Sequence, residues 1–194
     1  MTRQPSLFSQ RLRLDRPGVY ATDAESLLAY FETNKSHLQP WAPPQPLDYY
    51  TLGYWEDAVC KAQDNEAKDK GAGFLMRKAQ TDGGCIIGVI TLSEIVRGAF
   101  QACYLGYNLD HTQQGKGLMQ EALQLTIGYA FDTLNLHRIM ANYRPENARS
   151  AKTLEALGFK IEGTAENYLL IDGHWRDHVL TALTNPQWRN SSNA

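Results

Sequence analysis

The feature that most constrains this chain is a short glycine-containing turn, residues 114–119 with the sequence QGKGLM, which lies between a strand-like segment at 104–109 and a long amphipathic helix. The first amides of a helix have no internal partner, and the helix dipole adds roughly half a positive charge there. Glycine lets a phosphate approach the backbone closely. The turn therefore predicts an anion site, and a pyrophosphate is the ligand that suits it.

Two common nucleotide-binding loops do not fit this turn. A P-loop requires Lys-Ser or Lys-Thr after its last glycine, and a dinucleotide loop requires a third glycine where Gln120 stands. The spacing Gln114-x-x-Gly117-x-Met119 instead resembles the acetyl-CoA signature of the GNAT superfamily of N-acetyltransferases, which normally ends in Gly or Ala. Met119 departs from that last position. It keeps an amide donor but leaves less room between the helix and a phosphate.

The length and the charge of the chain limit the number of domains and the classes of binding partner. With 194 residues and 43% hydrophobic content, the chain is expected to form a single domain over 1–194 with one core. We expect a frayed tail from about residue 185. The net charge of -2 and the isoelectric point near 6.2 give no bulk attraction to nucleic acid or to anionic membranes. We therefore expect no direct sequence-specific binding of nucleic acid.

The predicted compartment is the cytoplasm. Cys60, Cys85 and Cys103 are odd in number and show neither a CxxC pair nor the spacing of metal ligands. The N-terminus carries no apolar signal segment, and no apolar run approaches the roughly 20 residues that a membrane helix needs. Membrane association is therefore not expected.

Hydrophobic periodicity predicts a mixed α/β fold. Turn signals at Arg97-Gly98 and Asp172-Gly173 indicate two hairpins. The proline-rich residues 40–46 are expected to form a surface loop, because proline is excluded from helix interiors and inner strands. We expect helices at 22–35, 50–68, 118–134 and 147–157, and strands at 11–14, 74–78, 86–96, 100–109, 138–142, 159–170 and 175–184.

A second landmark narrows the resemblance. Residues 147–150, with the sequence NARS, are followed by LGF at 157–159, as in the segment after the cofactor-binding helix of GNAT acetyltransferases. Three longer segments, at 96–107, 137–143 and 168–181, closely resemble the RimJ-type ribosomal-protein-alanine N-acetyltransferases. This resemblance runs from about residue 11 to 188, and it implies a central, mostly antiparallel sheet flanked by helices.

The family implies an activity and a cosubstrate. The expected reaction transfers acetyl from acetyl-CoA to the N-terminal α-amine of an alanine-starting small-subunit ribosomal protein, either free or in the subunit or its precursor, without a metal. The turn would bind the pyrophosphate, the strand end would pair with the pantetheine arm and direct an amide at the thioester oxygen, and Asn147 would hydrogen-bond the cofactor. A hydrogen bond from such an amide to the oxyanion that forms on attack can lower the activation free energy by ~3 kcal/mol. The residues expected to bind acetyl-CoA are Tyr107, Asn108, Leu109, Gln114, Gly115, Lys116, Gly117, Leu118, Met119 and Asn147.

The sequence specifies the catalytic acid and the catalytic base less closely than the acetyl-CoA site. Ser150 is a candidate acid for the departing thiolate, although it is also consistent with a solvated helix residue, as Asn147 is with a simple N-cap. An N-terminal amine has a pKa of about 7.7–8.0, so roughly a tenth to a fifth is neutral at pH 7 and a carboxylate acting through water would suffice. Strand parity does not choose among the alternative base candidates Glu162, Glu166 and Asp172.

One tryptophan and two histidines have more than one possible role. Trp41, in the proline-rich loop, is consistent with a substrate contact or with a hydrophobic anchor that holds the loop to the core. His174 and His178 have the spacing of same-face neighbours on a strand, but the sequence offers no third metal ligand.

Three functions remain open from the sequence. The first is the ribosomal-protein N-terminal acetyltransferase, and the second is an acetyltransferase of the same fold that acts on a small amine such as a polyamine or an antibiotic. The third is a ribosome-associated binding protein. An acidic cleft would favour a polyamine, whereas a groove with Trp41 on its rim would favour a peptide.

Overall fold

The computed structural model describes residues 6–80 and 84–189, and it contains a single sheet of eight strands. The order across the sheet is β1-β2-β3-β4-β5-β6-β8-β7, and every neighbouring pair is antiparallel except β5 and β6. The fold is therefore a mixed α/β fold with one open, mostly antiparallel sheet. The strands are β1 Ser6–Phe8, β2 Leu12–Asp15, β3 Ala72–Lys78, β4 Gly88–Val96, β5 Ala102–Leu109, β6 Arg138–Met140, β7 Lys160–Ile171 and β8 His174–Thr184.

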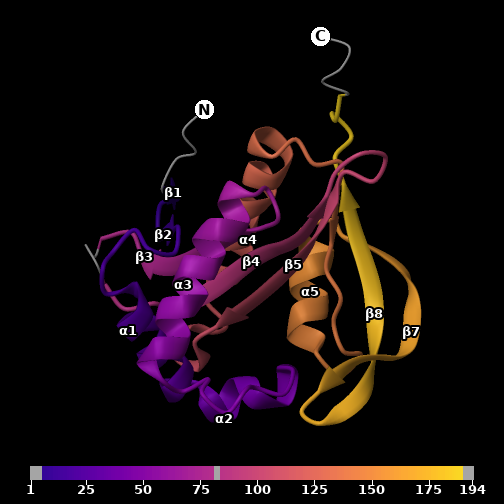
Figure 1. Ribbon diagram of the computed structural model, residues 1–194. Helices are drawn as coiled ribbons and strands as arrows, with labels where there is room; N and C mark the ends of the chain where they lie inside the picture. Colours follow the sequence, from indigo (N-terminus) through magenta and orange to yellow (C-terminus); the bar gives the residue numbers. More distant parts are fainter. Residues whose placement is uncertain (1–5, 81–83, 190–194) are drawn as a thin grey trace.

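Helices cover both faces of the sheet. Figure 1 shows α3 on the near side and the long β7–β8 hairpin at the right-hand edge. The α-helices are α1 Asp23–Thr33, α2 Lys35–Leu38, α3 Leu52–Ala67, α4 Leu118–Gly128 and α5 Ala148–Ala156. Among the described residues, no helix has the length and apolarity needed to cross a membrane.

Alternation along β3 explains the two layers of core. Phe74 and Met76 are buried in the larger cluster, which contains residues of α4 and α5, whereas Leu75 between them is buried with residues of α1 and α3. Successive side chains of a strand point to opposite faces of a sheet. The sequence of an inner strand with helices on both faces is therefore a run of mostly apolar residues, as in β3.

Most predicted elements are confirmed with shifted ends. Asn147 caps α5 by accepting a hydrogen bond from the Ser150 amide at 3.1 Å, and Gly158 ends that helix with a φ of 87°. The turn between β7 and β8 has positive φ at both Asp172 and Gly173, as a tight hairpin requires. These signals are local, so the sequence alone carries them.

Three predictions need correction, and one strand was not predicted. The strand β1 was missed, because three residues are too few for a periodic signal. The helix expected through residue 35 ends at Thr33, and α2 is a separate single turn. The predicted loop at 40–46 begins within a 3₁₀ turn, Gln39–Trp41, where Pro40 occupies an early helical position that needs no amide donor. The helix expected through residue 134 ends at Gly128 and continues as a π-helical turn, Tyr129–Thr133.

Residues 185–189, where the frayed tail is expected to begin, make hydrogen bonds to an earlier part of the chain. The Asn185 amide donates to the His137 carbonyl at 2.8 Å, and the Trp188 indole donates to the Asn135 carbonyl at 2.9 Å. Residues 185–189 are therefore attached to the segment before β6. The rest of the expected tail, residues 190–194, lies outside the described residues.

The parallel pair β5–β6 positions the site. The two strands pair over only three residues, from Ala102 opposite Arg138 to Tyr104 opposite Met140. Beyond Tyr104, β5 continues to Leu109 while pairing with β4 on its other side. Within the described chain, the end of β5 thus has an edge that β6 does not cover.

Candidate active site

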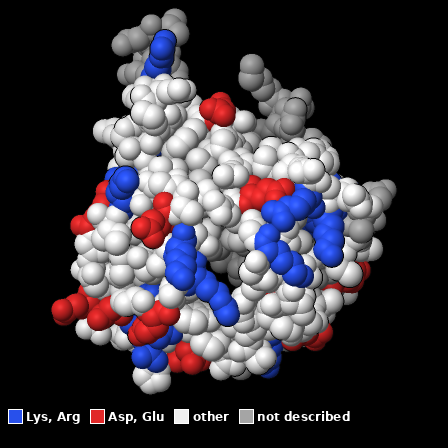
Figure 2. Space-filling view, turned by 180° about the vertical axis from the view of Figure 1, so that it is seen from behind, with Lys and Arg blue, Asp and Glu red and all other residues white. Residues whose placement is uncertain are grey.

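A large cavity lies beside this edge. Its volume is about 1660 Å³, and its lining comes from the end of β5, the loop before α4, the start of α5, the proline-rich loop and the β7–β8 hairpin. Figure 2 shows a hollow near the middle of the rear face, with Lys and Arg side chains on both sides of it. The charged residues that line the cavity are Lys35, Arg144, Arg149 and Lys152, with Glu146 and Asp172 as the acidic ones.

Nine of the ten residues predicted to bind acetyl-CoA line the cavity. Lys116 is the exception, because its ammonium group donates to the Thr112 carbonyl at 2.8 Å and to Gln113 Oε1 at 3.1 Å. The Lys116 carbonyl accepts from Arg11 Nη1 at 3.0 Å. Only the amide of Lys116 is thus left for a ligand.

The N-terminus of α4 has the features of an anion site. Gly117 occupies the N-cap position with a φ of 72°, and within residues 6–80 and 84–189 no side chain caps the helix there. Gly115 is also left-handed, at 74°, and a methyl group built on it would meet no atom of the described residues within 4 Å, its chain neighbours aside. Uncapped helix amides beside open space and two glycines fit a pyrophosphate.

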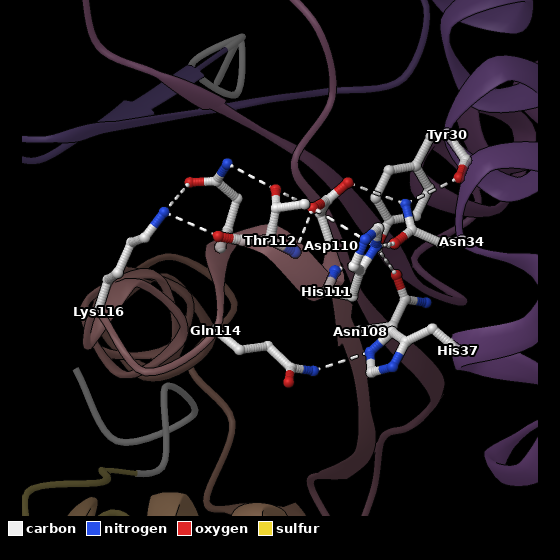
Figure 3. Close-up of polar contacts among 10 residues, drawn as sticks. Tyr30, Asn34, His37, Asn108, Asp110, His111, Thr112, Gln114 and Lys116 are labelled. Carbon is white, nitrogen blue, oxygen red and sulfur yellow. Dashed lines mark hydrogen bonds and ion pairs between the residues drawn. The ribbon is translucent and has the colours of Figure 1, made fainter.

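A network of polar contacts fixes the loop before α4 against α1 and α2 (Figure 3). Tyr30 donates to Asn108 Oδ1 at 2.7 Å, and Asn34 Nδ2 donates to Asp110 Oδ2 at 3.0 Å. Burial alone would raise the pKa of Asp110, but the hydrogen bonds from Thr112 and Asn34 outweigh it, so that pKa lies below its ordinary value. The ionised carboxylate therefore holds the turn that leads into the anion site.

His37 reaches the same loop from α2. Its Nε2 lies 2.8 Å from Gln114 Nε2, and the two side chains point toward each other in Figure 3. Burial, with the nearby His111 and Arg149, lowers the pKa of His37. A neutral imidazole accepts the Gln114 amide hydrogen, so His37 orients a residue of the glycine turn.

The strand end and α5 meet at a pair of hydroxyl groups. Tyr107 Oη lies 2.7 Å from Ser150 Oγ. Burial raises the pKa of Tyr107 to about 12, with a smaller opposing effect of the Ser150 hydrogen bond. The phenol stays protonated at neutral pH, so the pair can deliver a proton into the cavity. Both residues are site candidates in the sequence, but their pairing depends on how α5 packs beside β5.

The other predicted residues divide between the cavity and the outer surface. Asn147 uses its Oδ1 in the α5 cap, which leaves only its Nδ2 for a cofactor. Asp172 lines the cavity and accepts from Gln39 Nε2 at 3.2 Å. Glu162 and Glu166 do not line it, and Glu162 is instead ion-paired with Arg138, which lowers the pKa of that carboxyl group. We therefore set both aside as base candidates.

Trp41 lies on the rim of the cavity rather than in the core. Its side chain is 41% exposed, and the Arg144 guanidinium lies 5.2 Å from the centre of its ring. Arg144 also donates to the Pro40 carbonyl at 2.7 Å, and the Asp172 amide donates to the Ala42 carbonyl at 3.1 Å. The proline-rich loop is thus tied to both the β6–α5 segment and the β7–β8 hairpin, which disfavours the core-anchor interpretation.

Two cavity histidines were not recognised as site residues from the sequence. His37 carried no motif, and His178 was considered only as half of a metal pair, but both side chains line the cavity. Within the described chain, no group of three His, Cys, Asp or Glu side chains could hold a metal ion.

Comparison with known proteins decides the family. Residues 11–160 match the Acetyltransferase (GNAT) domain. The chain belongs to the GNAT acetyltransferase family. This GNAT protein is accordingly an acetyl-CoA-dependent N-acetyltransferase, and the uncapped α4 terminus and the free edge of β5 fit that cosubstrate.

Individual relatives cover most of the chain. The [ribosomal protein uS5]-alanine N-acetyltransferase of Escherichia coli (strain K12) is 46% identical over 170 residues, which is 88% of this chain and 87% of that protein. The structure of a ribosomal-protein-S5-alanine acetyltransferase from Vibrio fischeri aligns with a TM-score of 0.89 at 36% identity, covering 95% of this chain and 99% of the other. Mycobacterium smegmatis RimJ in complex with CoA-disulfide aligns with a TM-score of 0.83 at 28% identity, covering 93% and 85%.

The glycine at the α4 N-cap gives a first testable prediction. A non-glycine residue in the left-handed region costs roughly 1–2 kcal/mol, so Gly117→Ala should displace the loop amides. We expect the KM for acetyl-CoA to rise about tenfold, which corresponds to ~1.4 kcal/mol of binding energy. The matched control is Gly98→Ala, because Gly98 has the same φ of 72° but lies outside the cavity. Equal KM values in the two variants would exclude a role of the turn in binding.

Proposed function

We propose that this GNAT protein acetylates the N-terminal α-amine of an alanine-starting ribosomal protein of the small subunit, with the uS5 type as the first candidate. The identity of 46% with the Escherichia coli enzyme that carries this activity in its name supports the proposal. A substrate of this kind implies that the protein works in the cytoplasm, on the free ribosomal protein or on an assembling subunit.

The charge of the cavity is the observation that carries the choice of substrate class. Four Lys or Arg side chains line it, against two carboxylates. A polyamine carries several positive charges and needs an acidic cleft, whereas a peptide N-terminus presents one amine and a polar backbone. The basic lining therefore favours a peptide over a polyamine.

The chain's own residues can supply the chemistry. Acetyl-CoA brings an activated thioester, and the free edge of β5 would hold its pantetheine arm along Tyr107, Asn108 and Leu109. The Tyr107–Ser150 pair would protonate the departing sulfur. Trp41 and Arg144 would contact the incoming peptide at the rim.

The test is acetyl transfer to synthetic peptides that begin with Ala or Ser or are blocked at the N-terminus, alongside spermidine, followed by CoA release and mass spectrometry. We expect acetylation of the free Ala peptide and none of the blocked peptide. Turnover of spermidine alone would assign the protein to the small-amine class. Stable association of the Gly117→Ala protein with ribosomal particles, without any turnover by the wild type, would favour a binding protein instead.

Replacing Trp41 should weaken the binding of the peptide but not the binding of acetyl-CoA. Because the indole is 41% exposed at the rim, Trp41→Ala should raise the KM for the Ala peptide about fivefold, ~1 kcal/mol, and leave the KM for acetyl-CoA unchanged. Trp41→Phe keeps an aromatic face for Arg144, so it should raise the KM for the Ala peptide by a smaller factor. A fall in melting temperature without kinetic selectivity would return Trp41 to the role of an anchor.

A further inference from the structure

His178, on β8, is a buried imidazole in the wall of the cavity. Its side chain is 4% exposed, and its ring centre lies 5.6 Å from that of Tyr168 on β7. The Tyr168 hydroxyl accepts in turn from Asn142 Nδ2 at 3.2 Å. The ring therefore packs beside Tyr168, whose hydroxyl is itself held by Asn142, while it lines the cavity.

The contact of its other nitrogen determines the tautomer. His178 Nδ1 lies 3.0 Å from the carbonyl oxygen of Arg176. A carbonyl oxygen only accepts, so in the neutral ring Nδ1 carries the hydrogen and Nε2 has the lone pair. Among the hydrogen bonds of the described residues, none involves Nε2. The lone pair of Nε2 is thus available to accept a proton.

Backbone hydrogen bonds to Tyr143 connect the His178 segment of β8 with the surroundings of the Tyr107–Ser150 pair. The next residue, Val179, donates its amide to the Tyr143 carbonyl at 2.8 Å and accepts from the Tyr143 amide at 3.2 Å. Tyr143 lies near enough to Tyr107 to contribute to the raised pKa of that phenol. The imidazole and the Tyr107–Ser150 pair therefore belong to adjoining parts of one cavity wall.

The competing bases are engaged elsewhere. His37 Nε2 lies 2.8 Å from Gln114 Nε2, so this nitrogen is engaged with the glycine turn. The Glu146 carboxylate is exposed and lies 3.4 Å from Arg144 Nε. Asp172 is exposed in the hairpin turn, where it accepts from Gln39. His178 is the buried base that remains.

We propose that His178 Nε2 is the general base of the transfer. This inference rests on the proposed function and names the residue that would complete its chemistry. The neutral α-amine forms the C–N bond to the thioester carbon, and Nε2 takes the proton that this nitrogen must lose. The C–S bond then breaks, and the sulfur takes a proton from the Tyr107–Ser150 pair. Solvent returns the proton from His178 to that pair, so atoms and charge balance.

Two variants test the base. His178→Asn keeps a donor for the Arg176 carbonyl, and His178→Ala leaves space for an added base. We expect kcat for the Ala peptide to fall about 100-fold in both, within the range for lost general-base catalysis. Imidazole added to His178→Ala should restore the rate, and substituted imidazoles should do so in the order of their basicity. A purely structural role would not produce that order.

The controls separate this inference from the proposed function. His174→Gln changes an exposed histidine of β8 outside the cavity and should keep full activity. Calorimetry should give the same acetyl-CoA affinity for His178→Asn as for the wild type, and adding the Ala peptide to the CoA-bound wild type should shift the NMR signal of the His178 ring. If the wild type acetylates the Ala peptide but His178→Asn keeps more than a third of kcat, or if Asp172→Asn alone shows the loss, His178 is not the base. If the wild type acetylates only spermidine, the proposed function fails and the same variants still test the base.

Discussion

Arg77→Ala is expected to destabilise the fold by about 3–5 kcal/mol, because it removes the guanidinium that pairs with two buried carboxylates, leaving Asp23 without an ion-pair partner among the described residues and Asp15 with Arg13 alone. Arg77, on β3, is 1% exposed. Its Nη1 lies 3.1 Å from Asp15 Oδ2 and its Nη2 lies 2.6 Å from Asp23 Oδ1, with both carboxylates buried. Its Nε also donates to the Gly84 carbonyl at 2.7 Å.

Urea unfolding of the wild type and the variant at pH 7 measures this effect. Arg77→Lys should recover only part of the loss, because one ammonium cannot reproduce three directed N–H donors. The control is Lys68→Ala, which removes an exposed i,i+4 ion pair with Asp64 and should cost less than ~0.5 kcal/mol. A loss below ~1 kcal/mol for Arg77→Ala would mean that water enters this cluster and solvates the carboxylates.

The second large effect is expected at the hydroxyl pair. Tyr107→Phe and Ser150→Ala should each lower kcat about 100-fold, because each removes one member of the 2.7 Å contact that would deliver a proton to the sulfur. The acetyl-CoA affinity should stay within about twofold, since the loop amides and the β5 edge are untouched. Residues that act as one unit are not additive, so the double variant should lose little more than the worse single variant.

A matched control is available one turn along α5. Thr153 also lines the cavity, but its hydroxyl donates to the Arg149 carbonyl at 2.9 Å. Thr153→Ala should therefore keep kcat within about threefold, as expected for a hydroxyl outside the proton path. Additive losses in the Tyr107 and Ser150 variants, or an equal loss in Thr153→Ala, would contradict a joint role of the pair.

Local signals explain which parts of the fold could be predicted. The cap at Asn147, the left-handed Gly158 and the Asp172-Gly173 turn are determined by residues that are close in sequence. The glycine turn was located for the same reason, since its strand, its glycines and its helix are contiguous. A three-residue edge strand such as β1 carries no such signal.

Contacts between distant segments explain what the sequence could not supply. Glu162 was a base candidate, but its pairing with Arg138 depends on the placement of β7 and β8 beside β6. The contact of Trp41 with Arg144 joins residues that are far apart in the chain. The position of the His178 ring beside Tyr168 depends on the register in which β7 pairs with β8.

The site of acetylation on a whole substrate tests the proposed activity most directly. Purified uS5 with a free N-terminal alanine would be incubated with the protein and acetyl-CoA, and the product mapped by mass spectrometry. We expect a single acetyl group on the N-terminal α-amine, and no reaction when that amine is blocked beforehand. Acetylation of lysine side chains with the N-terminus untouched would contradict the proposed activity.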